Sequence, residues 1–110
     1  MKNANPWIEL CPGIKRRTQT SGKEMYQMVA LLDAGSQMPE HKHPSEQIVH
    51  ILSGRMRLIV DGEPHELATG DSFYLNSNVP HAVETLEETR VLDTFSPPRN
   101  EYLAADAHAL

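Results

Sequence analysis

Cysteine is nearly absent from this 110-residue sequence, which contains only Cys11. An internal disulfide and a thiolate metal cluster are therefore excluded, and we interpret Cys11 as a small, half-buried packing residue. Long hydrophobic runs are absent too, since no segment approaches the roughly 18 apolar residues of a membrane span and the first residues lack the apolar stretch of a signal peptide. We expect a cytoplasmic protein that does not enter a membrane.

Basic residues are in the minority, because 10 Lys and Arg stand against 15 Asp and Glu and give a formal net charge of -5. This balance offers no general attraction to a phosphate backbone, so we expect no nucleic-acid partner. The local cluster Lys15-Arg16-Arg17 is interpreted as a solvated strand edge, where charges discourage edge-to-edge pairing. The length is close to the most common domain size, and no repeat divides the chain. Any active site must therefore lie within one small domain.

Short apolar and β-branched runs follow one another along the chain, separated by turn residues about every 8 to 12 positions, which is typical of all-β proteins. Asp61-Gly62 predicts a two-residue hairpin turn, because a type I′ turn needs positive φ at both central positions. Several runs are apolar on both faces, so both faces must be covered, as in a sandwich or small barrel. The predicted strands cover residues 7–10, 14–18, 25–32, 47–52, 55–60, 65–67, 72–75, 81–85 and 89–95.

The densest chemical signal is the pair His41 and His43, which is followed by Gln47. Alternate side chains of an extended segment share a face, so both imidazoles can reach one ion. Gln47 opens the next predicted strand with a side-chain carbonyl that is able to bind a metal. The alternative interpretation of the two histidines is a solvent-exposed polar loop.

A second signal is the segment 70–81, which ends in Asn78-Val79-Pro80-His81. Asn78 can adopt left-handed geometry at little cost, and His81 opens the strand that follows. His81 is the natural further ligand for an ion held by His41 and His43. The two stretches together predict a metal site.

Both stretches resemble the two sequence motifs of the cupin superfamily. The first motif has a glutamate where this chain has Gln47, and it maps onto Gly35, His41, His43, Gln47 and Gly54. The second has a proline and a glycine where this chain has asparagines, and it maps onto Gly70, Asn76, Asn78 and His81.

The resemblance implies an all-β, single-domain cupin jelly-roll β-barrel with one divalent metal ion inside its mouth, and commonly a homodimer. We place the cupin domain at residues 6–103 and a C-terminal tail or short helix at residues 104–110. His50, which shares strand parity with Ile48 and Leu52, is assigned to the outer or dimer face. Imidazole and amide ligands accept Ni, Zn, Mn, Fe and Co alike, so the identity of the ion is open. Gln47 is either a direct ligand or the holder of a ligand water.

The segment 91–103 resembles the ending of the small pectin-degradation cupins of the KdgF type, which convert unsaturated monouronates to open-chain keto acids. The match to this ending implies that Asp93, Phe95 and Arg99 handle the substrate. The residues themselves agree, because Val91, Asp93 and Phe95 share one strand face. Each also has a structural alternative: Asp93 as an outward-facing residue, Phe95 as plain core and Arg99 as a surface ion-pair residue.

These observations predict a metal-dependent isomerase or tautomerase whose substrate is a small anionic, uronate-like sugar acid. Arg99 would bind the substrate carboxylate, Asp93 would move a proton and Phe95 would pack against the ring. Two alternatives stay open: a non-haem-iron dioxygenase of the same fold, and a non-catalytic sugar-acid binding or sensor protein.

Overall fold

The structure, a computed structural model, describes residues 3–109. Within this range the chain forms ten strands followed by one helix. The elements are β1 (Ile8–Cys11), β2 (Ile14–Ser21), β3 (Tyr26–Leu32), β4 (Gln37–His41), β5 (Glu46–Ser53), β6 (Arg55–Val60), β7 (Glu63–Ala68), β8 (Ser72–Leu75), β9 (His81–Thr85), β10 (Thr89–Ser96) and α1 (Asn100–Ala109).

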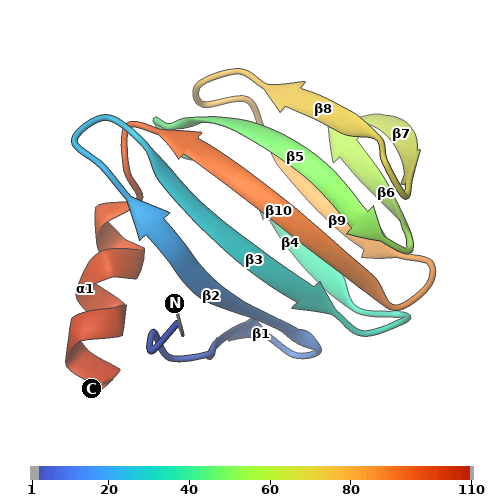
Figure 1. Ribbon diagram of the computed structural model, residues 1–110. Helices are drawn as coiled ribbons and strands as arrows, with labels where there is room; N and C mark the ends of the chain where they lie inside the picture. The colour runs from blue at the N-terminus through green and yellow to red at the C-terminus, as the bar shows by residue number, and fades with distance from the viewer. Residues whose placement is uncertain (1–2, 110) are drawn as a thin grey trace.

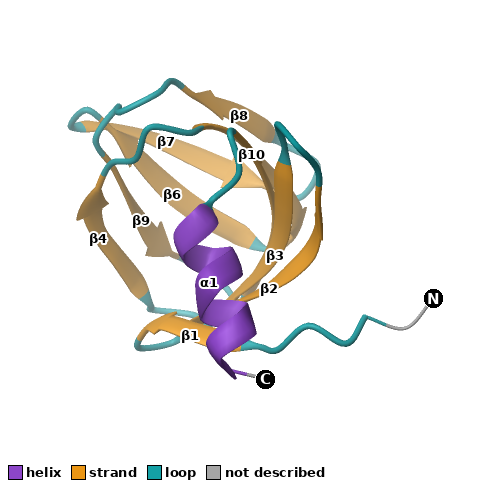
Figure 2. Ribbon diagram, turned by 90° about the vertical axis from the view of Figure 1, so that its left-hand side faces the viewer, coloured by secondary structure: helices purple, strands orange, loops and turns teal. Residues whose placement is uncertain are grey.

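The strands form two antiparallel sheets that face each other across the interior (Figure 1). The larger sheet has six strands in the order β1-β2-β3-β10-β5-β8, and the smaller has four in the order β4-β9-β6-β7. Figure 2 shows the strands arranged as a ring with α1 in front of it. The prediction of an all-β barrel in one compact domain is confirmed.

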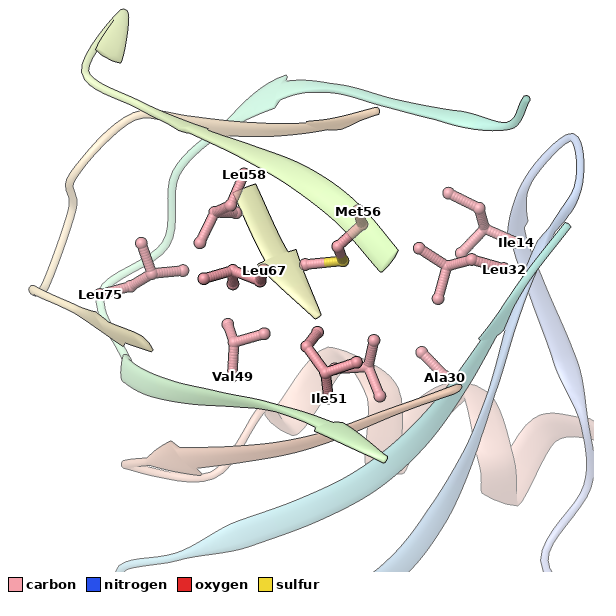
Figure 3. Packing of buried hydrophobic residues seen from close by; sticks show 10 residues of the cluster. Ile14, Ala30, Leu32, Val49, Ile51, Met56, Leu58, Leu67 and Leu75 are labelled. Carbon is pink, nitrogen blue, oxygen red and sulfur yellow. The ribbon is translucent and has the colours of Figure 1, made fainter. Parts of the chain in front are cut away.

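The barrel interior is apolar because alternate side chains of each strand point inward. On β5, for example, Val49 and Ile51 are buried, whereas Ile48 and Leu52 are exposed. Side chains from both sheets meet in one cluster (Figure 3), and removing this surface from water is the main favourable contribution to folding. Its buried members are Ile14, Ala30, Leu32, Val49, Ile51, Met56, Leu58, Leu67, Leu75 and Val91.

Helix α1 packs beside β2 (Figure 1) and is joined to it by a buried ion pair. Arg16 is fully buried and its Nη1 lies 2.6 Å from Asp106 Oδ1, while the Thr18 hydroxyl donates to Asp106 Oδ2 over 2.5 Å. The interpretation of the basic cluster as a solvated edge is therefore wrong for Arg16. Strand parity turns this residue inward together with Ile14 and Thr18, and Asp106 balances its charge.

The C-terminal residues 104–109, assigned from the sequence to a tail or short helix, form the later turns of α1. Leu110 lies outside the described residues. Among residues 3–109, no helix is both long enough and apolar enough to cross a membrane.

Strand β4 has no counterpart among the predicted strands. Its sequence Gln-Met-Pro-Glu-His lacks apolar alternation, and Pro39 has no N–H to donate to a neighbouring strand. The structure places β4 at the edge of the smaller sheet, which is where a strand tolerates proline.

Two of the predicted backbone features are present. Asp61 and Gly62 have φ values of 50° and 83° between β6 and β7, as the hairpin prediction requires, and Asn78 has a φ of 60°. Gly54 has a φ of 103°, and a Cβ added there would collide with the Glu88 carbonyl oxygen and lie 2.5 Å from Thr89 Oγ1. This close approach requires glycine at the end of the first motif.

Candidate metal centre and substrate cavity

Three histidines meet at one end of the barrel. His41 ends β4 and His81 begins β9, and the two residues face each other in the strand pairing, with ring centroids 4.3 Å apart. His43 follows β4 in the loop, and its ring lies 5.0 Å from that of His81 and 5.9 Å from that of His41. One ring nitrogen from each residue lies within 4.8 Å of the others. The structure thus brings together the histidines of both sequence motifs.

Backbone carbonyls orient all three rings in the same way. The Nδ1 atom lies 2.9 Å from the Pro39 oxygen in His41, 2.8 Å from the Ser45 oxygen in His43 and 2.8 Å from the Val79 oxygen in His81. A carbonyl oxygen can only accept, so each Nδ1 carries a proton, and in the neutral form of each ring Nε2 presents a lone pair. This is the arrangement that metal-binding histidines adopt.

Gln47, on β5 of the larger sheet, adds a further possible metal ligand to the three histidines. Its Nε2 donates to Asp93 Oδ1 over 2.8 Å, which leaves Oε1 without a hydrogen-bond partner among residues 3–109, although the atom is buried. The Nε2 atom of His43 is likewise buried and unpartnered within that range. Buried polar atoms are normally satisfied, so a pair of orphaned acceptors here fits a cation. The chemistry of three imidazoles and one amide oxygen suits a divalent transition metal.

Burial keeps two of these histidines neutral. It lowers the pKa of His81 from its ordinary 6.5 to about 4. Burial, aided by the positive charge of Arg99, also lowers the pKa of His43. Both rings therefore hold an unprotonated Nε2 at neutral pH, which is the form that binds metal.

Asp93 is a buried carboxyl in the centre of the larger sheet. On β10 it shares the inward face with Val91 and Phe95, which follows from the alternation of the strand. Burial raises the pKa of Asp93 from 3.8 to about 7, while the Gln47 hydrogen bond and the charge of Arg99 oppose this rise. A carboxyl group with such a pKa can both take up and release a proton near neutral pH.

Arg99 follows β10 and is buried rather than at the surface. Its guanidinium carbon lies 4.9 Å from the centroid of the Phe95 ring, and its Nε donates to Glu101. Phe95 is also buried and its ring lies 5.4 Å from that of His43. The side chains predicted to handle substrate thus adjoin the histidines.

One cavity of about 60 Å³ joins these groups. Six of the seven candidate residues line it, and the ring of the seventh, His43, lies beside the rings of three of them. Its polar wall also includes Tyr102 of α1, which the sequence analysis did not single out. Tyr102 could have been found from its spacing, because it follows Arg99 by three residues. Side chains three residues apart in a helix lie next to each other. The six lining candidates are His41, Gln47, His81, Asp93, Phe95 and Arg99.

Comparison with known proteins shows similarity over most of the chain. Residues 28–95 match the cupin domain family. The chain is 37% identical over 100 residues to the pectin degradation protein KdgF of Dickeya dadantii, covering 89% of this chain and 91% of that protein. The solved structure of KdgF from Halomonas sp. has a TM-score of 0.85 at 26% identity, covering 93% of this chain and 94% of that one. A salicylate 1,2-dioxygenase from Pseudaminobacter salicylatoxidans has a TM-score of 0.75 at 19% identity over 81% of this chain and 27% of that one, a likeness of fold alone.

Proposed function

Because the chain belongs to the cupin domain family, and within it resembles KdgF over nearly its whole length, we propose that it is a metal-dependent isomerase or tautomerase. Its substrate would be an unsaturated monouronate released in pectin degradation, and its product the open-chain keto acid. The observation that carries the proposal is the Asp93 carboxyl, which is buried in the same cavity as Arg99 and two of the three histidines. That cavity offers a proton carrier, a cation for a carboxylate and metal ligands side by side.

The residues fit one divalent ion, because backbone carbonyls engage the Nδ1 atoms of His41, His43 and His81 and leave each Nε2 for a metal. The Oε1 atom of Gln47 likewise has no hydrogen-bond partner among residues 3–109. When bound, such an ion supplies Lewis acidity toward a substrate oxygen. Gln47 has two tasks, since its amide nitrogen also fixes the Asp93 carboxyl.

Arg99 would bind the carboxylate of the uronate, because a planar guanidinium matches a carboxylate with two parallel hydrogen bonds. Phe95 would pack against the apolar face of the ring. The two side chains lie within cation–π distance of each other. A substrate held by both would place its reacting atoms toward the histidine end of the cavity.

Asp93 would move the proton. An unsaturated monouronate is a cyclic hemiacetal whose ring oxygen is attached to the carbon–carbon double bond. Asp93 takes the proton of the hemiacetal hydroxyl as the ring carbon–oxygen bond breaks, which leaves an aldehyde and an enolate. It then returns the proton to the alkene carbon of the enolate that bears no oxygen, giving the ketone. Substrate and product are isomers, so no oxidant or co-reactant is needed.

The proposal is tested with the metal-loaded protein and an unsaturated monouronate. We expect wild type to remove the conjugated absorbance and Asp93→Asn to be slower by about 100-fold or more, the lower range for loss of a general acid–base. Glu84→Gln, which alters an exposed carboxylate on β9, is the matched control and should act as wild type. Equal rates in wild type and Asp93→Asn would contradict the assignment.

The two alternative functions give different results in the same assay. A dioxygenase would consume oxygen with an aromatic or diketone substrate, and a binding protein would hold the monouronate unchanged. The similarity to a dioxygenase is one of fold alone, and it lends that alternative no chemical support. A cytoplasmic location and a homodimer remain predictions from the sequence.

A further inference from the structure

The first turn of α1 brings Tyr102 to Arg99. The Arg99 carbonyl oxygen accepts hydrogen bonds from the backbone nitrogens of Tyr102, over 3.0 Å, and Leu103, over 3.2 Å. Arg99 is therefore the residue that caps the helix, and Tyr102 is the third residue inside it. Side chains at these two positions lie next to each other across the first turn, as they do in a capping box.

Two aromatic rings and one carboxylate contact the Arg99 guanidinium. Its central carbon lies 4.2 Å from the Tyr102 ring centroid and 4.9 Å from that of Phe95, both within cation–π range. Nε donates to Glu101, and this is the one side-chain hydrogen bond that the guanidinium makes among residues 3–109. These contacts leave free the edge that would form two hydrogen bonds with a carboxylate.

Tyr102 is itself fixed by a second arginine. The guanidinium carbon of Arg16 lies 4.6 Å from the centroid of the Tyr102 ring, and Arg16 Nη2 donates to the Tyr102 carbonyl oxygen over 3.2 Å. Arg16 in turn is held by Asp106. The Tyr102 ring thus contacts two cations.

The two cations differ in how they are neutralised. The partner of Arg16 is the buried Asp106, whose side chain is 9% exposed. The partner of Arg99 is Glu101, whose side chain is 61% exposed, so water screens that pairing. Arg16 therefore anchors the ring, whereas Arg99 keeps charge available for an anion entering the cavity.

We propose that Tyr102 is a positioning residue, which holds the Arg99 guanidinium in the orientation that receives the substrate carboxylate. The identity of the substrate rests on the function proposed above, whereas the positioning of Arg99 does not. Tyr102 acts on the substrate only through Arg99. The Arg99 guanidinium lies over the ring of Tyr102, so the ring and not the hydroxyl is the part that positions it.

The positioning is measured first without substrate, by NMR relaxation of arginine Nε–H groups in isotope-labelled protein. In wild type we expect the Arg99 signal to be restricted. In Tyr102→Leu it becomes mobile, and in Tyr102→Phe it stays restricted because the ring is kept. Leu103→Ala is the matched structural control, because Leu103 packs from the same helix on the same cluster as Tyr102. An Arg99 signal that is equally restricted in Tyr102→Leu and wild type overturns the proposal.

The second measurement is kinetic. Tyr102→Leu should raise KM for the unsaturated monouronate on the order of 10-fold with little change in kcat, which is the effect of losing a cation–π contact that orients a binding group. The methyl ester of the same substrate has no carboxylate, so its KM should not respond to Tyr102→Leu. An equal rise in KM for acid and ester would show a general structural role and overturn the proposal.

If Tyr102→Leu does not fold, a variant that keeps an aromatic ring at position 102 replaces it in the test. Replacement of the Tyr102 ring by pentafluorophenylalanine keeps the volume and removes the negative ring face that attracts a cation. We expect Arg99 to become mobile in this protein, and an unchanged signal would contradict the inference. Absence of turnover in wild type would refute the proposed function, while the NMR result would still decide the role of Tyr102.

Discussion

At the scale of single residues, the pKa of Asp93 affects both the proposed proton transfer and the stability of the folded protein. Burial raises its pKa from 3.8 to about 7, so between those values the native protein holds a proton that the unfolded chain has lost. The contribution of Asp93 to the free energy of unfolding therefore falls as pH rises through this range. Three pKa units correspond to about 4 kcal/mol.

The matching prediction compares wild type with Asp93→Asn, both free of metal, by urea unfolding between about pH 4 and pH 8. The variant should gain about 4 kcal/mol relative to wild type across this interval, because it has no carboxyl to ionise. His81 acts in the opposite direction, since its pKa is lowered from 6.5 to about 4, but it is present in both proteins and cancels. Parallel pH profiles would show that Asp93 is not desolvated.

Gln47 carries the prediction for metal binding. Its buried, unpartnered Oε1 is the one metal ligand that we propose from the larger sheet. We expect Gln47→Leu to weaken binding of Zn²⁺ or Ni²⁺, titrated calorimetrically, by about 10- to 100-fold. Gln27→Leu, which changes a glutamine on another strand of the same sheet, should bind as wild type does. Unchanged affinity in Gln47→Leu would remove this residue from the site.

Residues of the candidate metal site could be named from sequence because each lies in one of two short local motifs. His41 and His43 are two residues apart, and a proline directly follows His43 and directly precedes His81. Arg16 could not be assigned in this way. Its neutralising partner, Asp106, lies 90 positions further along the chain, and no local pattern reports a contact at that distance.

At the scale of elements, α1 depends on the ion pair that joins it to β2. Asp106→Ala would leave the fully buried Arg16 without a counter-charge, which typically costs about 3–5 kcal/mol. Urea unfolding of the variant should show a loss of this size. Glu84→Ala removes an acid from the pair with Arg57, whose two side chains are 37% and 41% exposed, and should cost about 1 kcal/mol or less. Similar losses in the two variants would contradict the account.

Strand identity was predictable where a short apolar or β-branched run stands between turn residues, and the prediction failed where no such run exists. β5 has the expected inward and outward positions, and its bounds follow the pattern closely. β4 is held in place by pairing with β9, a tertiary contact that its own composition does not signal. The C-terminal segment was ambiguous for a similar reason. Within α1 only Asp106 is buried, so the helix has no apolar stripe for a sequence pattern to reveal.

At the scale of the whole molecule, the outer face of the larger sheet exposes apolar side chains. Ile48 is 49% exposed and Tyr74, its cross-strand partner, 54%, with Leu52 on the same face of β5 at 40%. Grouped apolar side chains of this kind favour association. We predict a homodimer through this face, which fits the expectation from the cupin resemblance.

Sedimentation velocity at micromolar concentration tests the assembly. Ile48→Glu should shift the protein to the monomer, because a carboxylate would be buried in the interface without a partner. Thr20→Glu adds the same charge at an exposed position of β2 and should leave the dimer intact. A wild-type monomer, or a dimer that tolerates Ile48→Glu, would refute the use of this face.

The position of β10 has a consequence for how the protein is made. This strand, the last one within residues 3–109, pairs with β3 on one side and β5 on the other. While the ribosome is still adding residues before Thr89, both neighbours exist with their facing edges unpaired, and open edges invite strands from other molecules. A premature stop codon after β5 and before β10 should therefore yield inclusion bodies instead of a smaller soluble protein.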